Sequence, residues 1–186
     1  YPGMKEPPVE HGGVTDMVFC LARCEVADFL RRVRTSTNFD GSWHELSTSK
    51  LPLSAKDKAI NELEELLEGK YLKYCDASIP LHFLAVILTN SSLCKLRHFV
   101  HHPRLLPDRG ASLSQPEKDQ FVQWSVDMAK YHNVLNSDER TKRFSWFTSV
   151  NGPIDAYIHL LKDLRIRTVG DLADKAWEQM HEALHY

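Results

Sequence analysis

The stretch PLHFLAVILTNSSLCKLRHFVHHP, residues 80–103, decides the fold that the sequence predicts. Up to Thr89 it is apolar on nearly every side of a helix, and a helix of that kind is buried at the centre of a protein. Pro80 suits the first turn of this helix, because the N–H that proline lacks has no partner there. Pro103 ends the helix, since the residue before a proline avoids the helical conformation. The sequence therefore predicts one long central helix that begins near Leu81.

Amphipathic segments on both sides predict further helices around this one. Apolar residues recur at helical spacing over residues 16–34, 54–74, 115–135, 154–167 and from about 170 onward, with a shorter aromatic helix over 138–150. Ser54 with Asp57, and Ser114 with Glu117, form the spacing typical of a helix N-terminus. The segment 16–34 has only a narrow polar face, which predicts a largely buried helix.

The predicted fold class is all-α, with about seven helices in an irregular bundle, because no segment alternates as a strand does. Residues 1–14 are rich in proline and glycine and are expected to form an extended N-terminal arm. Residues 15–186 are expected to form a single helical domain, which suits the length of the chain.

Charge and hydropathy argue against two classes of partner. The 23 Lys and Arg residues are balanced by 25 Asp and Glu residues, so the net charge of -2 offers no general attraction to nucleic acid. The longest apolar run, residues 83–88, is far too short to span a membrane. The sequence thus predicts neither direct nucleic-acid binding by this segment nor membrane insertion.

The four cysteines are Cys20, Cys24, Cys75 and Cys94, and they form no CxxC pair. A chain of this length and composition has no need of disulfide bonds to hold its core. The sequence therefore predicts four reduced thiols, each buried as a small apolar side chain.

A reactive cluster is suggested by Cys94, His98 and His101 or His102, which recur at helical spacing and share one face. Two or three such ligands on a helix can begin a zinc site, and a thiol beside an imidazole can act as a nucleophile. The same cationic residues also suit a helix C-terminus, where they meet unpaired carbonyl groups. We favour this structural role because the face offers no carboxylate ligand and no third group to orient the pair. No metal and no cofactor is predicted.

Histidine and aromatic side chains suggest a pocket for a small molecule, because an all-α domain can enclose an apolar ligand with a few orienting polar groups. The same residue types more often serve as hydrogen-bonded core residues. No catalytic residue is identified, and whether the chain is an enzyme stays open. The candidate ligand-binding residues are His82, His98, His102, Arg104, Tyr131, His132, Trp146, Tyr157 and His159.

Three stretches together carry a family resemblance. They are GGVTDMVFCLARCEVADFLRRV (residues 12–33), LEGKYLKYCDASIPLHFLAVILTNSSLCKLRHFVHHPR (67–104) and YIHLLKDLRIRTVGDLADKAW (157–177). In order and spacing they resemble the regulatory domain of fungal-specific transcription factors, over most of residues 15–177.

The resemblance implies an all-helical region, often called the middle homology region, that lies downstream of a DNA-binding binuclear zinc cluster. It implies a nuclear protein in which this region restrains or directs the activator and senses a metabolite. The six-cysteine zinc cluster and the first half of the regulatory domain are absent from this chain, so we expect no direct DNA contact. TSVNGPIDAYIHLL, residues 148–161, also departs from the usual family pattern.

Two alternatives differ in class. A free-standing derivative of the domain would be a cytoplasmic small-molecule-binding protein or an enzyme of fungal secondary metabolism. A helical scaffold would bury the apolar helix of residues 81–96 against a protein partner or a second copy of the chain. The predicted partners are therefore a small-molecule metabolite and a protein. The protein partner is either a different chain or a second copy of this one.

Overall fold

The computed structural model describes residues 15–32, 51–106, 108–148 and 152–185. In these ranges it contains α-helices and short 3₁₀ turns and no strand, which confirms the predicted all-α class. The expected N-terminal arm lies outside the described residues. The helices are α1 (Val18–Arg32), α3 (Leu53–Lys70), α4 (Pro80–Val100), α5 (Gln115–Ser137), α6 (Ser145–Thr148), α7 (Ile154–Leu164) and α8 (Asp171–Ala183).

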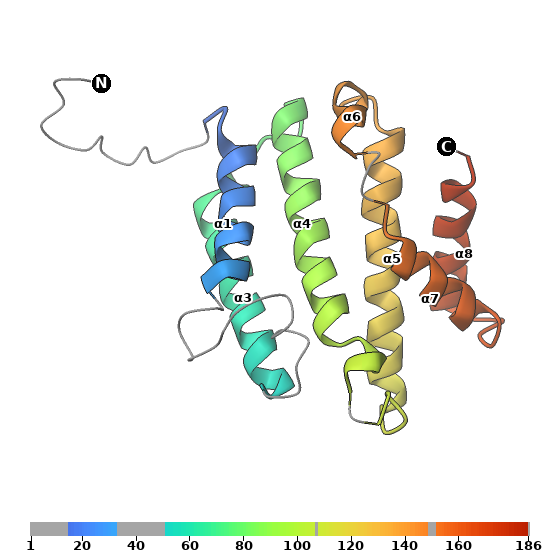
Figure 1. Cartoon of the computed structure of the whole chain (residues 1–186). Coiled ribbons are helices and arrows are strands. Elements are labelled where there is room, and N and C mark those ends of the chain that lie inside the picture. Colours follow the sequence, from blue (N-terminus) through green and yellow to red (C-terminus); the bar gives the residue numbers. More distant parts are fainter. Residues whose placement is uncertain (1–14, 33–50, 107, 149–151, 186) are drawn as a thin grey trace, which may run out of the picture.

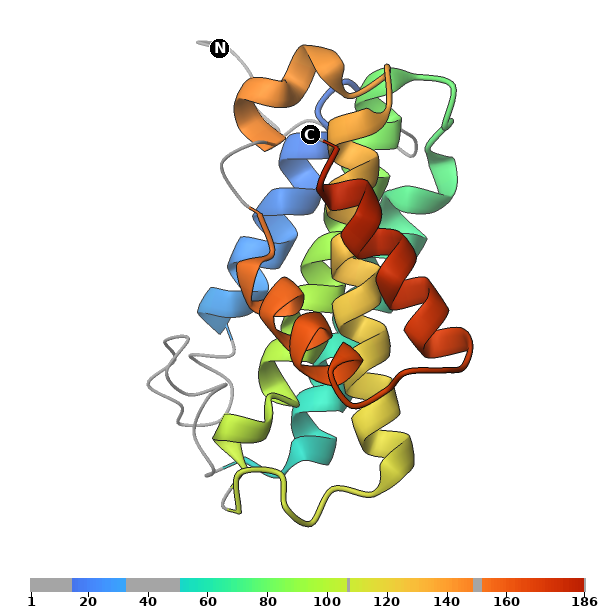
Figure 2. The ribbon, with the colours of Figure 1, turned by 90° about the vertical axis from the view of Figure 1, so that its right-hand side faces the viewer.

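The long helices α4 and α5 lie side by side at the centre of the molecule (Figure 1). α1 and α3 pack against α4, whereas α7 and α8 pack against α5. Figure 2, turned by 90°, shows α7 and α8 in front of α5. The predicted central position of the helix that begins at Pro80 is thereby confirmed.

Two apolar cores meet at the contact between α4 and α5. The first joins α1, α3 and α4 through fully buried side chains such as Ile60, Leu67 and Leu96. The second joins α5, α7 and α8 around Ala129 and Leu160. A third, small cluster of Cys94, Met128 and Ala156 bridges α4, α5 and α7. α7 is thus held against both central helices, and this contact positions the site described below.

Local signals placed the starts of α4 and α5 correctly and the start of α3 wrongly. Pro80 occupies the first turn of α4 as predicted, and the Ser114 N–H donates to Glu117 Oε2 at 2.8 Å in a capping box. Ser54, however, lies inside α3, because the extended backbone of Pro52 already starts that helix. Asp57 instead bonds His101 Nε2 at 2.7 Å across to the end of α4. The predicted Ser54 cap is wrong.

Three other predicted helices differ in extent from the structure, and one of them, α7, was predicted to reach residue 167 but ends at Leu164. α3 ends at Lys70 and is followed by a separate 3₁₀ turn over Leu72–Tyr74. The aromatic segment 138–150 divides into a 3₁₀ turn, Lys142–Phe144, and the single turn of α6. Here the Thr141 hydroxyl donates to the Asp138 carbonyl at 2.7 Å, which favours a tight turn over a continuous helix.

α1 is an outer helix rather than the largely buried one that was predicted. Only Val18 and Ala22 are fully buried, while Met17 is 55% exposed. Cys20 and Cys24 are exposed as well, so the prediction of four buried thiols is wrong for this pair. The reason is that, among the described residues, α1 packs against α3 and α4 and touches Phe147 of α6 through Phe19, and these contacts do not cover Cys20 and Cys24.

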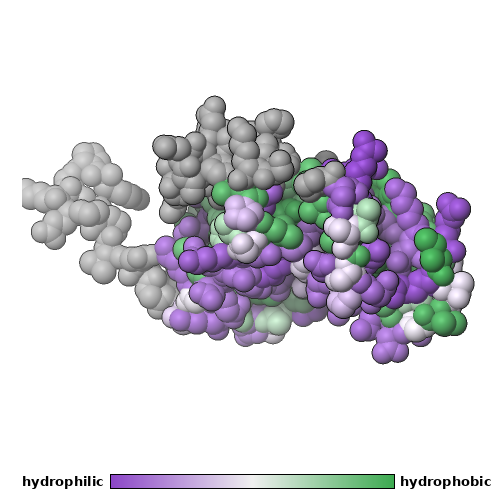
Figure 3. All heavy atoms as spheres, turned by 90° about the horizontal axis from the view of Figure 1, so that it is seen from below, coloured by the Kyte–Doolittle hydropathy of each residue, from purple (hydrophilic) through white to green (hydrophobic). Residues whose placement is uncertain are grey.

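The other two cysteines behave more nearly as expected, since Cys94 is buried and Cys75 is half-buried. All four thiols are free. Seen from below, the described surface mixes hydrophilic and hydrophobic residues (Figure 3). In the described ranges no helix has both the length and the apolar character needed to cross a bilayer.

Candidate functional site

Three histidines meet where the end of α4 approaches α5 and α7. His98 belongs to the last turn of α4, His102 follows that helix, and His159 comes from α7. The ring of His98 stacks on Phe121 at 4.4 Å between centroids, and the rings of His102 and His159 lie 4.9 Å apart. We call His98, His102 and His159 the histidine cluster. All three were predicted as site residues by type, and the fold brings them together.

Hydrogen bonds assign the proton positions in this cluster. His102 Nδ1 accepts the Arg104 N–H at 3.0 Å, so the proton of the neutral His102 ring lies on Nε2. That Nε2–H faces His159 Nε2 at 3.0 Å and donates to it, which leaves the His159 proton on Nδ1. His98 Nε2 is buried and has no hydrogen-bond partner among the described residues.

Burial keeps the cluster uncharged. It lowers the pKa of His98 to about 3, with His159 and His102 as further causes, and it lowers the pKa of His159 to about 4. The pKa of His102 is also lowered, chiefly by burial and then by the charge of Arg104. At neutral pH the histidine cluster therefore offers neutral hydrogen-bonding groups rather than positive charge.

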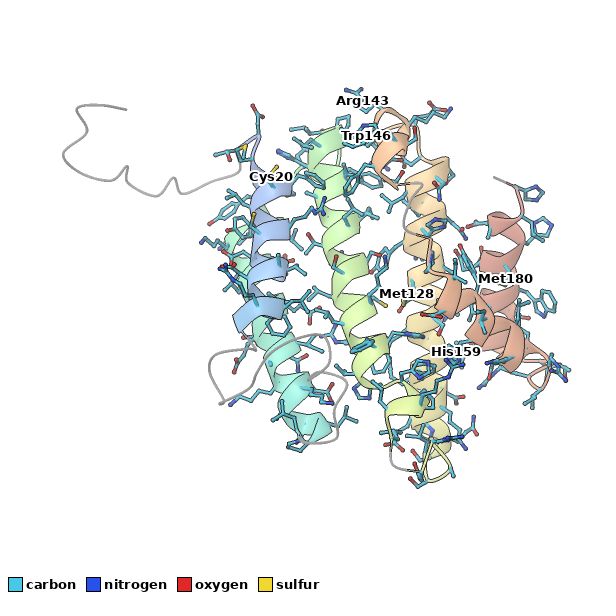
Figure 4. The ribbon with its side chains drawn as sticks, in the orientation of Figure 1. Cys20, Met128, Arg143, Trp146, His159 and Met180 are labelled. Atoms are coloured by element: carbon cyan, nitrogen blue, oxygen red, sulfur yellow. The ribbon has the colours of Figure 1, made fainter. Side chains whose placement is uncertain are left out.

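A cleft of about 520 Å³ opens beside these histidines. Its volume lies within the range of roughly 300–1,000 Å³ found for small-molecule sites. Figure 4 shows Met128 between α4 and α5, and His159 near the lower ends of these helices, well below Trp146. The lining residues are Lys95, His98, Phe99, His102, Met128, Gly152, Pro153, Ile154 and Asp155.

A smaller cavity of about 30 Å³ shares part of its lining with the cleft. Lys95, Met128 and Pro153 line both spaces, and His132 lines the smaller one. Of the residues predicted from the sequence, His98 and His102 thus line the cleft, and His132 lines the smaller cavity. Sequence reasoning did not select Lys95, whose position in the basic end of the helix gave no separate signal.

A second polar group ties α5 to α7 and α8. The Tyr157 hydroxyl lies 3.1 Å from His132 Nδ1 and donates to Asn133 Oδ1 at 3.3 Å. Asn133 Nδ2 in turn donates to the Gln179 carbonyl at 2.9 Å and to Gln179 Oε1 at 3.1 Å. Asn133 was missed by the sequence analysis, although a polar residue on the inner side of an amphipathic helix is a signal for such a contact. These hydrogen bonds hold α7 and α8 against α5, so we assign the group a structural role.

The remaining predicted site residues lie apart from the cleft. His82 Nδ1 accepts the Asp76 N–H at 3.1 Å and so fixes the turn before α4. Trp146 is 73% exposed on α6, and Arg104 is exposed beyond the histidine cluster. Tyr131 packs against the small cluster that bridges α4 and α5, and burial raises the pKa of its hydroxyl.

Cys94, His98 and His101 do not converge as ligands. The Cys94 Sγ–H donates to the Trp124 carbonyl at 3.3 Å, and burial raises the pKa of this thiol to about 12. Across the ranges that the structure covers, no group of three or more His, Cys, Asp or Glu side chains is arranged to hold a metal ion. A thiol with so high a pKa is protonated at neutral pH and is not an activated nucleophile.

The neutral state of His98 predicts a loss of stability in acid. Between about pH 7.5 and pH 5 the unfolded chain takes up a proton at the ordinary pKa of 6.5, whereas folded His98 does not. The unfolded state then binds more protons, so the free energy of unfolding falls as the pH falls. We expect His98→Phe, which keeps a ring against Phe121, to remove about 1–2 kcal/mol of this loss.

Urea unfolding at the two pH values measures this effect. His181→Phe is the matched control, because it makes the same substitution at an exposed position of α8. Equal pH dependence in wild type and His98→Phe would show that His98 accepts a proton freely in the folded protein.

Comparison with known proteins identifies curated relatives of this chain. No family model and no solved structure matches it. The transcriptional regulator AacuB of Aspergillus aculeatus is 31% identical over 181 residues, which are 97% of this chain and 24% of that protein. The aurofusarin cluster transcription factor aurR2 of Gibberella zeae is 31% identical over 92% of this chain and 25% of its own length.

The transcriptional regulator nsrM of Aspergillus novofumigatus is 29% identical over 90% of this chain and 24% of that protein. The chain therefore spans about a quarter of the length of the curated relatives that it matches. These matches confirm the resemblance drawn from the three sequence stretches: the chain is homologous to a segment of fungal transcription factors that makes up about a quarter of their length.

Proposed function

We propose that this chain is a regulatory domain of a fungal transcription factor and that it responds to a small metabolite bound in the cleft beside the histidine cluster. The observation that carries the regulatory role is the similarity to transcriptional regulators along 97% of the chain. Two of the relatives are named for secondary-metabolite clusters, aurofusarin and pyriculol/pyriculariol, so genes of that kind are the proposed targets. The nucleus is the proposed location, and DNA contact falls to segments other than this one.

The cleft supports the response to a metabolite. Its walls come from α4, α5 and the start of α7, so a ligand there contacts elements of both apolar cores. A ligand shifts an equilibrium between two arrangements only if it contacts them differently. A ligand that bridges α7 to α4 meets that condition, because it favours the arrangement in which the two helices are close.

An enzyme of secondary metabolism is less well supported. Cys94 is a protonated thiol, and His98 is neutral and without a carboxylate to orient it among the described residues. Acid–base or nucleophilic chemistry needs a group whose pKa is poised for it and whose geometry is held by a third group. We therefore favour ligand binding over catalysis as the function of the cleft.

A reporter assay tests the regulatory proposal. The chain is inserted between a bacterial DNA-binding domain and an activation domain in yeast, and reporter expression is compared with that of the same fusion without the chain. We expect the chain to lower expression several-fold, as a domain that restrains an activator does. Unchanged expression would contradict the regulatory role.

A pair of variants tests whether the cleft takes part in regulation. Ile154→Trp places a large ring at the cleft, which Ile154 lines, whereas Ile166→Trp adds the same ring at a site that is 87% exposed and outside it. We expect Ile154→Trp to change reporter expression and Ile166→Trp to leave it as in wild type. Equal reporter expression from the two variants would mean that regulation does not depend on this cleft.

A further inference from the structure

Lys95 is unusual among the partly buried cations of this protein. Arg97 pairs with Glu64 at 2.5 Å and Arg167 with Asp163 at 2.8 Å. Lys95 is also partly buried, yet among the residues that the structure describes its ammonium has no carboxylate and no hydrogen-bond acceptor. It lines both the cleft and the smaller cavity.

The neighbours of Lys95 do not neutralise it. Cys94 is protonated at neutral pH because burial raises its pKa to about 12. Burial also lowers the pKa of His132, with the charge of Lys95 as the second cause. Asp155 lines the same cleft but is exposed and forms no ion pair with Lys95 in the described ranges. Burial accordingly lowers the pKa of Lys95 itself, which expresses the unfavourable transfer of an unpaired ammonium out of water.

The rest of the cleft supplies two further features. Phe99, Met128, Pro153 and Ile154 supply apolar walls to the cleft that Lys95 also lines. His98 is 5% exposed, lines the same cleft, and its Nε2 lacks a partner among the described residues. A buried polar atom without a partner is uncommon in native proteins and is explained when a bound group supplies the missing hydrogen bond.

We infer that the cleft binds an organic acid with an apolar or aromatic body, whose carboxylate pairs with Lys95 and whose further polar group bonds His98 Nε2. This names the ligand class of the proposed regulatory function and rests on it. A single ammonium among apolar walls matches one carboxylate. It does not match a phosphate or a nucleotide, which proteins bind with several cationic or N–H donors.

The charges around the cleft agree with an anion. Arg104 and Lys162 both lower the pKa of His102 and of His159, so both lie close enough to add positive potential at the histidine cluster. Asp155 opposes them from the first turn of α7. Arg104 and Lys162 are exposed and do not line the cleft, so Lys95 is the cation among the described residues that line it.

A thermal-shift experiment on this chain tests the inference with defined probes. Benzoic acid, 2-naphthoic acid and anthracene-2-carboxylic acid are each compared with the corresponding primary amide, which has the same shape and no charge. We expect at least one acid to raise the melting temperature by several degrees and its amide to have little effect, because a ligand stabilises by its affinity for the folded state alone.

Lys95→Met is the test variant, since it keeps the length of the side chain and removes the charge. We expect it to abolish the shift caused by the acid and to raise the melting temperature of the unliganded protein, because an unpaired buried charge is removed. Lys130→Met is the matched control: Lys130 is exposed on α5 and does not line the cleft, so this variant should respond to the acid as wild type does.

The outcomes distinguish this inference from the proposed function. Equal shifts with acid and amide, or an undiminished acid shift in Lys95→Met, would overturn recognition of the carboxylate while leaving a ligand cleft in place. If none of the acids shifts the melting temperature more than its amide, the inference is overturned, whereas the regulatory role is judged by the reporter. A lower melting temperature in unliganded Lys95→Met would assign Lys95 to the packing instead.

Discussion

Leu160→Ala is expected to lower the free energy of unfolding by about 3 kcal/mol, since removal of a fully buried leucine side chain leaves a cavity. Leu160 is 0% exposed and lies on the side of α7 that packs against α5 and α8. The loss should be large because α7 has eleven residues and few other fully buried side chains, Ala156 among them. Urea unfolding followed by circular dichroism measures the change.

The adjacent residue offers a matched control. Leu161 is 49% exposed on the same helix, so Leu161→Ala makes the same chemical change with little loss of buried contact. We expect its effect to stay below about 1 kcal/mol. Equal losses from the two variants would mean that α7 does not dock through Leu160, and the position of His159 beside α4 would then lose its support.

Asn133→Asp is the second change for which we expect a loss of about 3 kcal/mol at neutral pH. Asn133 is 1% exposed, and its Nδ2 donates to both the backbone and the side-chain oxygen of Gln179. An ionised aspartate of nearly the same shape has no donor for these oxygens and places a charge in the interior. α5 and α8 should therefore separate more readily.

The pH dependence of this variant has a defined sign. Burial raises the pKa of the introduced carboxyl in the folded state, so the folded variant binds more protons than the unfolded one. The difference in unfolding free energy between Asn133→Asp and wild type should accordingly shrink from about pH 7.5 to about pH 5. Asn61→Asp, at an exposed position of α3, is the control and should cost less than about 1 kcal/mol. A difference that grows in acid would contradict a buried carboxylate.

Local chemistry accounts for the parts of the fold that could be predicted. The apolar run after Pro80 needs cover on all sides, which made α4 central in the prediction and in the structure. The capping box of Ser114 with Glu117 acts within one turn, so the start of α5 was readable in the same way. Ser54 failed because Pro52 provides an equally local start two residues earlier, and nothing in the pattern ranks the two.

The extent to which α1 is buried could not be predicted from the local sequence pattern. An apolar stripe shows which residues a helix can bury, but not how many neighbours cover it. Among the described residues α1 contacts α3 and α4, and Phe19 adds a ring contact to Phe147 of α6, yet these neighbours leave Cys20 and Cys24 exposed. The same limit applies to Trp146, which residue type alone favoured for a pocket.

The candidate site likewise has one part that the sequence predicts and another that only the tertiary structure decides. The sequence by itself placed His98 and His102 close together, because they are four residues apart where one predicted helix ends. Only the tertiary structure decided that His159, 57 residues beyond His102, completes the cluster, since that depends on the docking of α7 through Leu160. The role of Lys95 is also tertiary: whether an ammonium has a carboxylate partner depends on which side chains the packing brings near it, and no spacing along the chain encodes that.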